Sequence, residues 1–230
     1  MGVGKRVVLL LTLVWLVPHV ALADSISVGD KVVLQMTDAS QITGAGPLIL
    51  TANNDPTTAF VTFCMQWGVG TWADVGSTLD VAGVTDFATW QSPDTGGDAN
   101  GRDYLSSQTA WLYTQFRDGG LAGFDGSVNA SAALQWAIWQ LQNEVSIPVG
   151  QTYSDLANSF IALADQAVAD GFTGIGDVRV LNLVSADGTD AQDQLTLLPE
   201  PSSLELLALS AFALFIGRHR FALGRAREVI

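Results

Sequence analysis

The chain has 230 residues, enough for one domain together with targeting segments. Its formal net charge is −13, and a domain with this acidic surface repels phosphate backbones, which argues against nucleic acid as a partner. Cys64 is the one cysteine of the sequence, so an internal disulfide is excluded. Away from the two ends, only four residues are basic: Lys31, Arg102, Arg117 and Arg179.

Residues 1–23 have the pattern of a secretory signal peptide. Two basic residues precede an apolar run over 7–17, and Ala21 and Ala23 supply the small residues that a signal peptidase requires. A permanent anchor is the weaker interpretation, because the apolar run is too short to span a bilayer comfortably. We expect the mature chain to begin at Asp24.

The first half of the mature chain is predicted to be strands. Short apolar or β-branched runs alternate with turn residues such as Gly, Asn, Asp and Pro. The predicted strands cover residues 31–36, 47–51, 59–64 and 77–84.

The middle of the chain is predicted to be helical. Leu105, Leu112 and Phe116 form a helical stripe that ends at Asp118-Gly119-Gly120. A second helix over 131–142 is apolar on nearly every side and is therefore expected to be buried. The third helix has its apolar residues over 156–167, with Ser154 as its predicted N-cap and Gly171 as its stop.

The chain then returns to strand over 178–184 and 194–197. Strands, helices and strands in this order predict an α+β fold, a β-rich sandwich or barrel with a helical insertion. We expect a passenger domain over 24–197, between the signal peptide and a C-terminal segment over 198–230.

The C-terminal segment has three parts. Pro199-Glu200-Pro201 is followed by an apolar run from Leu204 to Gly217, which is short for a membrane span. Arginines directly after an apolar run hold that end in the cytoplasm and leave the folded part outside. These stop-transfer residues are Arg218, Arg220, Arg225 and Arg227.

This order of parts resembles the PEP-CTERM sorting signal of Gram-negative bacteria. The resemblance implies an exosortase-type sorting enzyme as a partner, a transient inner-membrane intermediate, and delivery to the cell surface or an extracellular matrix. It implies nothing about the activity of the passenger domain.

Gln135 is an unusual residue in the most apolar predicted helix. Burying a carboxamide without partners costs about 1–3 kcal/mol, so one interpretation is that Gln135 is hydrogen-bonded in the core. The other couples it to Cys64. If the thiolate attacks the Gln135 carbonyl and ammonia leaves, an internal thioester forms, and both the buried amide and the oxidisable thiol are accounted for.

The segments Phe63-Cys64-Met65-Gln66 and Leu134–Gln140 resemble the paired Cys and Thr-Gln-x-Ala-type motifs of bacterial thioester domains, although Leu134 replaces the usual Thr. The resemblance implies a thioester between Cys64 and Gln135 that captures amines on a partner, and a β-rich fold with a helical insertion. Trp136 and Trp139 are suited to shield that bond. Its target is expected to be a surface protein or a polysaccharide.

The sequence also bears on three other classes of function: a hydrolytic enzyme, a structural surface protein and a Ca²⁺-binding protein. The mature domain has no histidine, which excludes Ser-His or Cys-His nucleophiles, and its carboxylates form no evident pair for a hydrolase. Capture of an amine is a single-turnover reaction, so we expect neither an enzyme nor a cofactor. A structural surface protein without a thioester stays as the alternative.

A Ca²⁺ loop is a further candidate site, because Asp and Asn oxygens alternate before a glycine, but a solvated turn is the favoured interpretation. Its residues would be Asp94, Asp98, Asn100 and Asp103.

Overall fold

The computed structural model of the chain describes residues 24–43, 46–68, 74–89 and 97–198. The predicted signal peptide and the whole of the Pro-Glu-Pro, apolar and arginine segment lie outside these residues. Among the helices of the described residues, none is long and apolar enough to cross a membrane.

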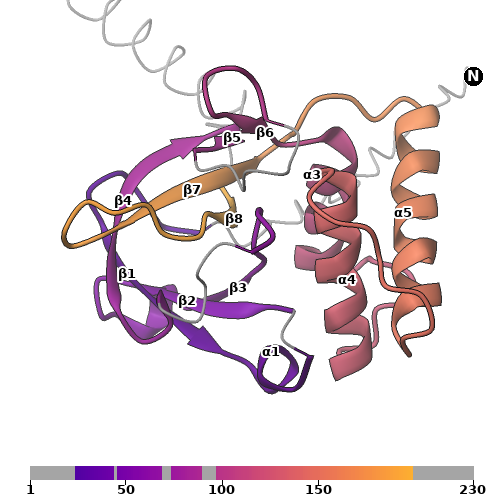
Figure 1. Cartoon of the computed structure of the whole chain (residues 1–230), viewed down its shortest axis with the longest axis horizontal. Helices are drawn as coiled ribbons and strands as arrows, with labels where there is room; N and C mark the ends of the chain where they lie inside the picture. Colours follow the sequence, from indigo (N-terminus) through magenta and orange to yellow (C-terminus); the bar gives the residue numbers. More distant parts are fainter. Residues whose placement is uncertain (1–23, 44–45, 69–73, 90–96, 199–230) are drawn as a thin grey trace, which may run out of the picture.

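A six-stranded antiparallel sheet forms the body of the domain, in the order β3-β2-β1-β4-β7-β8. The sheet curls until β8 meets the residues that follow β3, where Cys64 and Gln194 form an antiparallel bridge. The result is a nearly closed barrel (Figure 1). Its strands are β1 (Lys31–Met36), β2 (Leu48–Ala52), β3 (Phe60–Thr62), β4 (Thr78–Thr85), β7 (Val178–Ser185) and β8 (Gln194–Leu197).

Alternation of side chains explains which face of each strand is inside. Val32 and Leu34 of β1 are fully buried, whereas Lys31 is exposed, as expected for a strand with one face on the core. In β8, by contrast, every residue is buried. This strand therefore lies inside the domain on both faces, at the place where the barrel closes.

Three helices between β6 and β7 lie side by side on one flank of the barrel (Figure 1). They are α3 (Ser107–Arg117), α4 (Val128–Leu141) and α5 (Ser154–Ala169). The short helix α1 (Asp38–Thr43) also contacts α4. The described residues also include two shorter elements: the 3₁₀ turn η1 (Pro56–Thr58) and the two-stranded sheet of β5 (Phe87–Ala88) and β6 (Asp103–Tyr104).

The helix ends follow ordinary capping chemistry. Ser106 Oγ accepts a hydrogen bond from the main-chain N–H of Thr109 at 3.1 Å and begins α3, which ends just before Gly119 adopts a φ of +69°. The prediction that Ser154 caps the third helix is wrong, because Ser154 is the first residue of α5. Its hydroxyl donates to Pro148 O and accepts from the Gln151 N–H.

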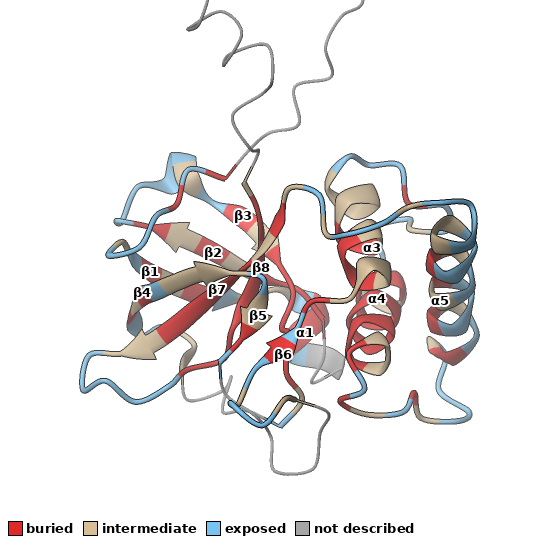
Figure 2. Cartoon of the chain, turned by 90° about the horizontal axis from the view of Figure 1, so that it is seen from above, coloured by how far each residue is buried: buried red, intermediate tan, exposed pale blue. Residues whose placement is uncertain are grey.

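Helix α4 is the most buried helix, as the sequence predicts. Ten of its fourteen residues are buried. Figure 2 shows this helix in the buried colour between the barrel and α5, whose outer face is exposed. Of the two architectures left open by the sequence, a sandwich or a barrel, the structure has a β-rich, nearly closed barrel with a few helices.

Candidate functional site

The barrel closes along a short seam, which we define as residues 63–66 together with residues 192–195. The main-chain N–H of Leu195 donates to Phe63 O at 3.0 Å, and that of Met65 donates to Asp193 O at 3.0 Å. Cys64 and Gln194 are the bridge partners between these two bonds. Directly opposed residues of an antiparallel pair point their side chains to the same side of the sheet.

The side chains of Cys64 and Gln194 meet at this seam. Gln194 Nε2 lies 3.6 Å from Cys64 Sγ and donates to Gln192 O at 3.2 Å. Cys64 is 4% exposed and Gln194 is fully buried. Gln194 Oε1 is also buried, and no hydrogen bond reaches it from the residues that the structure describes.

Gln135 reaches the same cysteine in a different way. Its Oε1 accepts a hydrogen bond from the main-chain N–H of Cys64 at 2.9 Å, and its Nε2 donates to Cys64 O at 2.8 Å. The two predicted residues are thus brought together, from the seam and from α4. The carboxamide of Gln135 is fully buried and has a partner at each end, so it meets the ordinary requirement for a buried polar group.

Two further glutamines fix the main chain around the cysteine. Gln66 Oε1 accepts from the main-chain N–H of Asp193 at 3.0 Å, and Gln192 Nε2 donates to Gln66 O at 2.6 Å. Gln192 and Gln194 were not predicted as site residues. The sequence marks Gln135 because it interrupts an apolar helix, whereas glutamines in and before a four-residue strand give no such signal.

Trp67, which directly follows the seam in the chain, forms a cluster with Trp136 and Trp139 of α4. The ring of Trp67 lies 5.0 Å from that of Trp136 and 4.7 Å from that of Trp139, measured between centroids. Trp136 is 7% exposed and Trp139 is 4% exposed. Because Trp67 is three residues beyond Cys64, the two predicted shielding residues pack against the chain segment that carries the thiol.

A pair of buried carboxyl groups lies beside this tryptophan cluster. Glu144 Oε2 accepts from the main-chain N–H of Trp67 at 2.9 Å, and Asp103 is contacted by Gln142 Nε2 at 3.5 Å. Burial, followed by the charge of Glu144, raises the pKa of Asp103 to about 6. The contacts of each carboxyl with other groups of the protein favour a structural role for this pair.

Asp193, on the other face of the seam, is fully buried and accepts four hydrogen bonds. They come from the main chain of Thr89 and Leu183 and from the side chains of Thr89 and Asn182, at 2.8–3.3 Å. Burial raises its pKa to about 6. These bonds tie the start of β8 to β7 and to the residues after β5.

Of the four residues that could form a Ca²⁺ loop, the described part of the chain includes Asp98, Asn100 and Asp103. Asp98 Oδ1 accepts from the main-chain N–H groups of Asn100 and Arg102, so it stabilises its own turn. Asp103 lies on β6 and is buried, and Asp94 is outside the described residues. Among the described residues, no group of three or more His, Cys, Asp or Glu side chains is placed to hold a metal ion.

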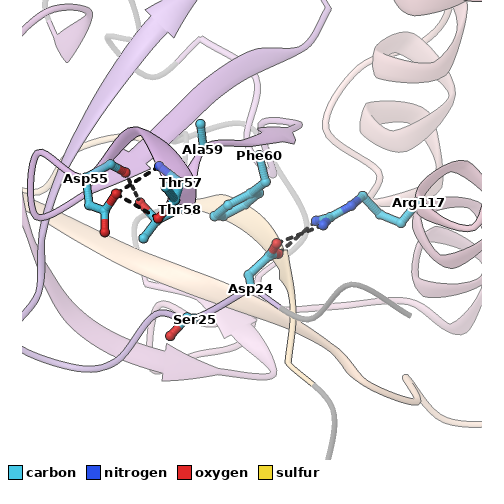
Figure 3. Close-up of a pocket in the computed structure, with 8 residues that line it drawn as sticks. All are labelled: Asp24, Ser25, Asp55, Thr57, Thr58, Ala59, Phe60 and Arg117. Carbon is cyan, nitrogen blue, oxygen red and sulfur yellow. Dashed lines mark hydrogen bonds and ion pairs between the residues drawn. The ribbon is translucent and has the colours of Figure 1, made fainter. Parts of the chain in front are cut away.

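A pocket of about 420 Å³ opens beside the first described residue (Figure 3). Its charged groups are engaged within the protein: Asp24 pairs with Arg117, and Asp55 Oδ1 accepts from the main-chain N–H and the hydroxyl of Thr57. We therefore assign no ligand to it. The pocket is lined by Asp24, Ser25, Asp55, Thr57, Thr58, Ala59, Phe60 and Arg117.

The geometry of the seam is the most distinctive feature of the described residues. Comparison of the chain with protein-family models, with curated proteins and with solved structures gives no significant match.

Proposed function

We propose that the domain is an exported surface protein that forms an internal thioester at Cys64 and uses it to capture an amine on a partner. The observation that carries this proposal is the contact between Cys64 Sγ and the carboxamide of Gln194, 3.6 Å away at Nε2. In this proposal the acyl group comes from Gln194 rather than from Gln135.

Reaction between the two side chains is balanced without another reactant. The sulfur attacks the carboxamide carbon of Gln194, the carbon–nitrogen bond breaks, and ammonia leaves with the thiol proton. A thiol held against its acceptor by two paired segments reacts at a high effective concentration, which can supply several kcal/mol of the barrier. The burial of both groups then keeps water away from the product.

The unpaired oxygen of Gln194 supports this choice. An amide oxygen buried without a donor costs about 1–3 kcal/mol, and such a group in a native structure requires an explanation. A thioester carbonyl is less polarised than an amide carbonyl, so it loses less by lacking a donor. Conversion of the carboxamide to a thioester therefore relieves an unfavourable contact.

Gln135 has a positioning role in the proposed site. Its hydrogen bonds to the N–H and the carbonyl of Cys64 fix the main chain from which the thiol projects. Because a carboxamide offers one acceptor and one donor side by side, it matches these two groups at once. No apolar side chain of the same size would do so.

Capture of a partner would proceed by one further acyl transfer. A primary amine attacks the thioester carbon, an amide forms at position 194, and the Cys64 thiol is released. The protein ends as a covalent adduct, so each molecule reacts once. The sequence features of both ends support export and surface sorting, which bring such a domain to amines of surface proteins or amino sugars.

The test is the intact mass of the exported protein. We expect it to be one ammonia lighter than its sequence requires, to gain the mass of one methylamine on treatment with that amine, and then to show a titratable thiol. Cys64→Ala should have full mass and should not react. Full mass and a titratable thiol in the untreated wild type would leave the second candidate, a structural surface protein in which Cys64, Gln135 and Gln194 are core residues.

A further inference from the structure

Asp24 is the first described residue, and it is built into the end of the barrel that contains the seam. Its carboxylate accepts hydrogen bonds from Thr196 Oγ1 at 2.9 Å and from the main-chain N–H of Leu197 at 2.8 Å. Its own main-chain N–H donates to Leu197 O at 2.9 Å. Asp24 is only 7% exposed, although it stands at the start of the predicted mature chain.

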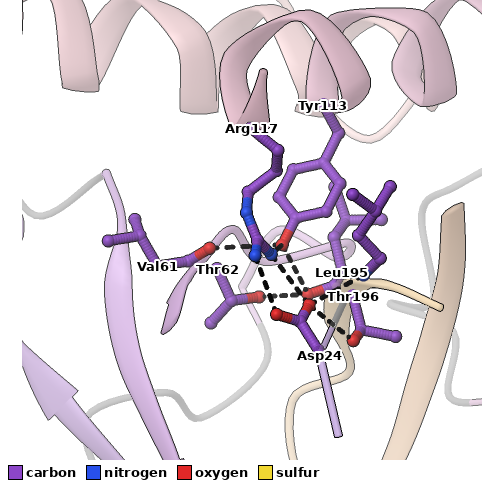
Figure 4. A network of polar contacts seen from close by, with 8 residues as sticks. Asp24, Val61, Thr62, Tyr113, Arg117, Leu195 and Thr196 are labelled. Carbon is purple, nitrogen blue, oxygen red and sulfur yellow. Dashed lines mark hydrogen bonds and ion pairs between the residues drawn. The ribbon is translucent and has the colours of Figure 1, made fainter. Parts of the chain in front are cut away.

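The same carboxylate holds α3 against the strands. Arg117 makes a bidentate ion pair with Asp24, 2.8 Å from Nη1 to Oδ2 and 2.8 Å from Nη2 to Oδ1. Arg117 Nη1 also donates to the hydroxyl of Tyr113 at 3.0 Å, and that hydroxyl lies 3.2 Å from the carbonyl oxygens of Val61 and Leu195 (Figure 4).

These contacts end on the two segments that carry the proposed reacting groups. Val61 is three residues before Cys64, and Leu195 directly follows Gln194. Thr62 Oγ1 donates to the same Leu195 carbonyl at 2.6 Å. Asp24 therefore holds the far end of β8, while the hydrogen bonds of Asp193 hold its beginning. Gln194 lies between the two fixed points.

The seam needs such support because its strand pairing is short. A slip of one residue in a β-strand turns every side chain to the opposite face, so it would take Gln194 away from Cys64. The main-chain bonds of Leu195 and Met65 across the seam are few, and β8 has four residues. Buried side-chain bonds can therefore decide the register.

We propose that Asp24 is a positioning residue: its carboxylate fixes β8 in the register that sets Gln194 against Cys64. This inference rests on the proposed function for its chemical consequence. Cleavage after Ala23 would make Asp24 the N-terminal residue, and its new ammonium group would keep Leu197 O as an acceptor. Signal-peptide removal is then compatible with a closed seam.

The experiment compares Asp24→Asn with two controls in the exported protein, produced from the full-length gene. Leu34→Ala removes a buried side chain of β1, away from the seam, and controls for loss of stability. Asp80→Ala removes the exposed ion pair between Lys31 and Asp80 and controls for loss of a carboxylate. Two quantities are measured below the unfolding transition: hydrogen exchange of the Met65 and Leu195 amides, and the rate at which ammonia is lost.

We expect Asp24→Asn alone to raise the exchange of the two seam amides relative to amides of β1, and to slow thioester formation by on the order of tenfold to a hundredfold. Seam exchange that is unchanged, or that rises equally in Leu34→Ala, would overturn the inference. A wild type that keeps its ammonia would refute the proposed thioester, while the exchange data would still decide whether Asp24 fixes the seam.

Discussion

Gln194 faces Cys64 across the bridge that closes the barrel, with Nε2 3.6 Å from Sγ, whereas Gln135 binds the main chain of the same cysteine. The two glutamines are thus placed for different tasks. A carboxamide beside the sulfur can become the acyl group, and a carboxamide bonded to the main chain can hold the sulfur in place.

This division of roles predicts different results for two alanine substitutions: one should abolish the thioester, and the other should lower stability and slow thioester formation. Gln194→Ala removes the acyl group, so the protein should have the mass of its sequence and a thiol that titrates fully. Gln135→Ala removes the two hydrogen bonds that Gln135 makes with the main chain of Cys64 and should lower the free energy of unfolding by about 1–3 kcal/mol. The thioester should still form in Gln135→Ala, more slowly than in the wild type.

Intact mass and urea unfolding measure the two effects separately. Gln66→Ala is the matched control, since it removes another buried seam carboxamide, one that accepts from the Asp193 N–H. It should behave like Gln135→Ala. A Gln194→Ala protein that still lacks one ammonia, together with a Gln135→Ala protein of full mass, would return the acyl role to Gln135.

The strand and helix order could be predicted from the sequence because local patterns decide it. Residues 31–36 and 194–197 were predicted as strands and form β1 and β8 with those bounds. The burial of α4 followed from apolar residues around its whole circumference. The cap of α5 was misplaced because Ser154 and Tyr153 both precede the apolar stripe, and the choice depends on a loop carbonyl, Pro148 O.

The seam could not be predicted in the same way because it depends on contacts between distant residues. Cys64 and Gln194 are 130 positions apart, and their meeting requires the curl of six strands. Gln135 was singled out by its local contrast with apolar neighbours. Gln194 has no such contrast, and Asp24, the first described residue, gives no local sign that it is buried.

The buried pair of Asp103 and Glu144 predicts that stability falls as pH rises. The pKa of Asp103 is raised from 3.8 to about 6, so the folded state binds a proton more tightly than the unfolded state does. The stabilisation from the protonated carboxyl is full below pH 4 and is lost as pH rises through 6, by about 3 kcal/mol for a change of this size. Asp193, with a pKa of about 6, adds to the same trend.

Asp103→Asn should remove part of this dependence and raise the unfolding free energy at pH 7. Urea unfolding at several pH values between 4 and 8 provides the measurement. Asp98→Asn is the control, because hydrogen bonds lower the pKa of Asp98, and its loss should leave the fall in stability above pH 4 in place. A wild-type stability that increases from pH 4 to 7 would contradict the assignment. A fall in stability over this range that is equal in the two variants would contradict it as well.

The Pro-Glu-Pro motif predicts a sorting defect when its prolines are replaced. If an exosortase-type enzyme recognises this motif, as the sequence predicts, replacing Pro199 and Pro201 by Ala should leave unprocessed protein in the inner membrane. Cell fractionation and the mass of the recovered chain provide the measurement. Pro148→Ala, in the loop before α5, should be processed normally. Equal processing of both variants would remove the support for exosortase sorting.

Trp139→Ala tests whether the tryptophan cluster protects the proposed thioester. Loss of this 4% exposed ring removes its contacts with Trp67 and Trp136 and should cost about 3–5 kcal/mol of stability. Because Trp67 follows the seam directly, water should reach the bond more often. Hydrolysis would leave a carboxylate at position 194 and a free Cys64 thiol, so the rate of thiol release measures the protection.

Trp111→Ala, which replaces a partly buried tryptophan of α3, is the control for a lost indole. We expect faster thiol release in Trp139→Ala alone, measured at a temperature where both variants are folded. Equal release rates would mean that the barrel rather than the cluster excludes water.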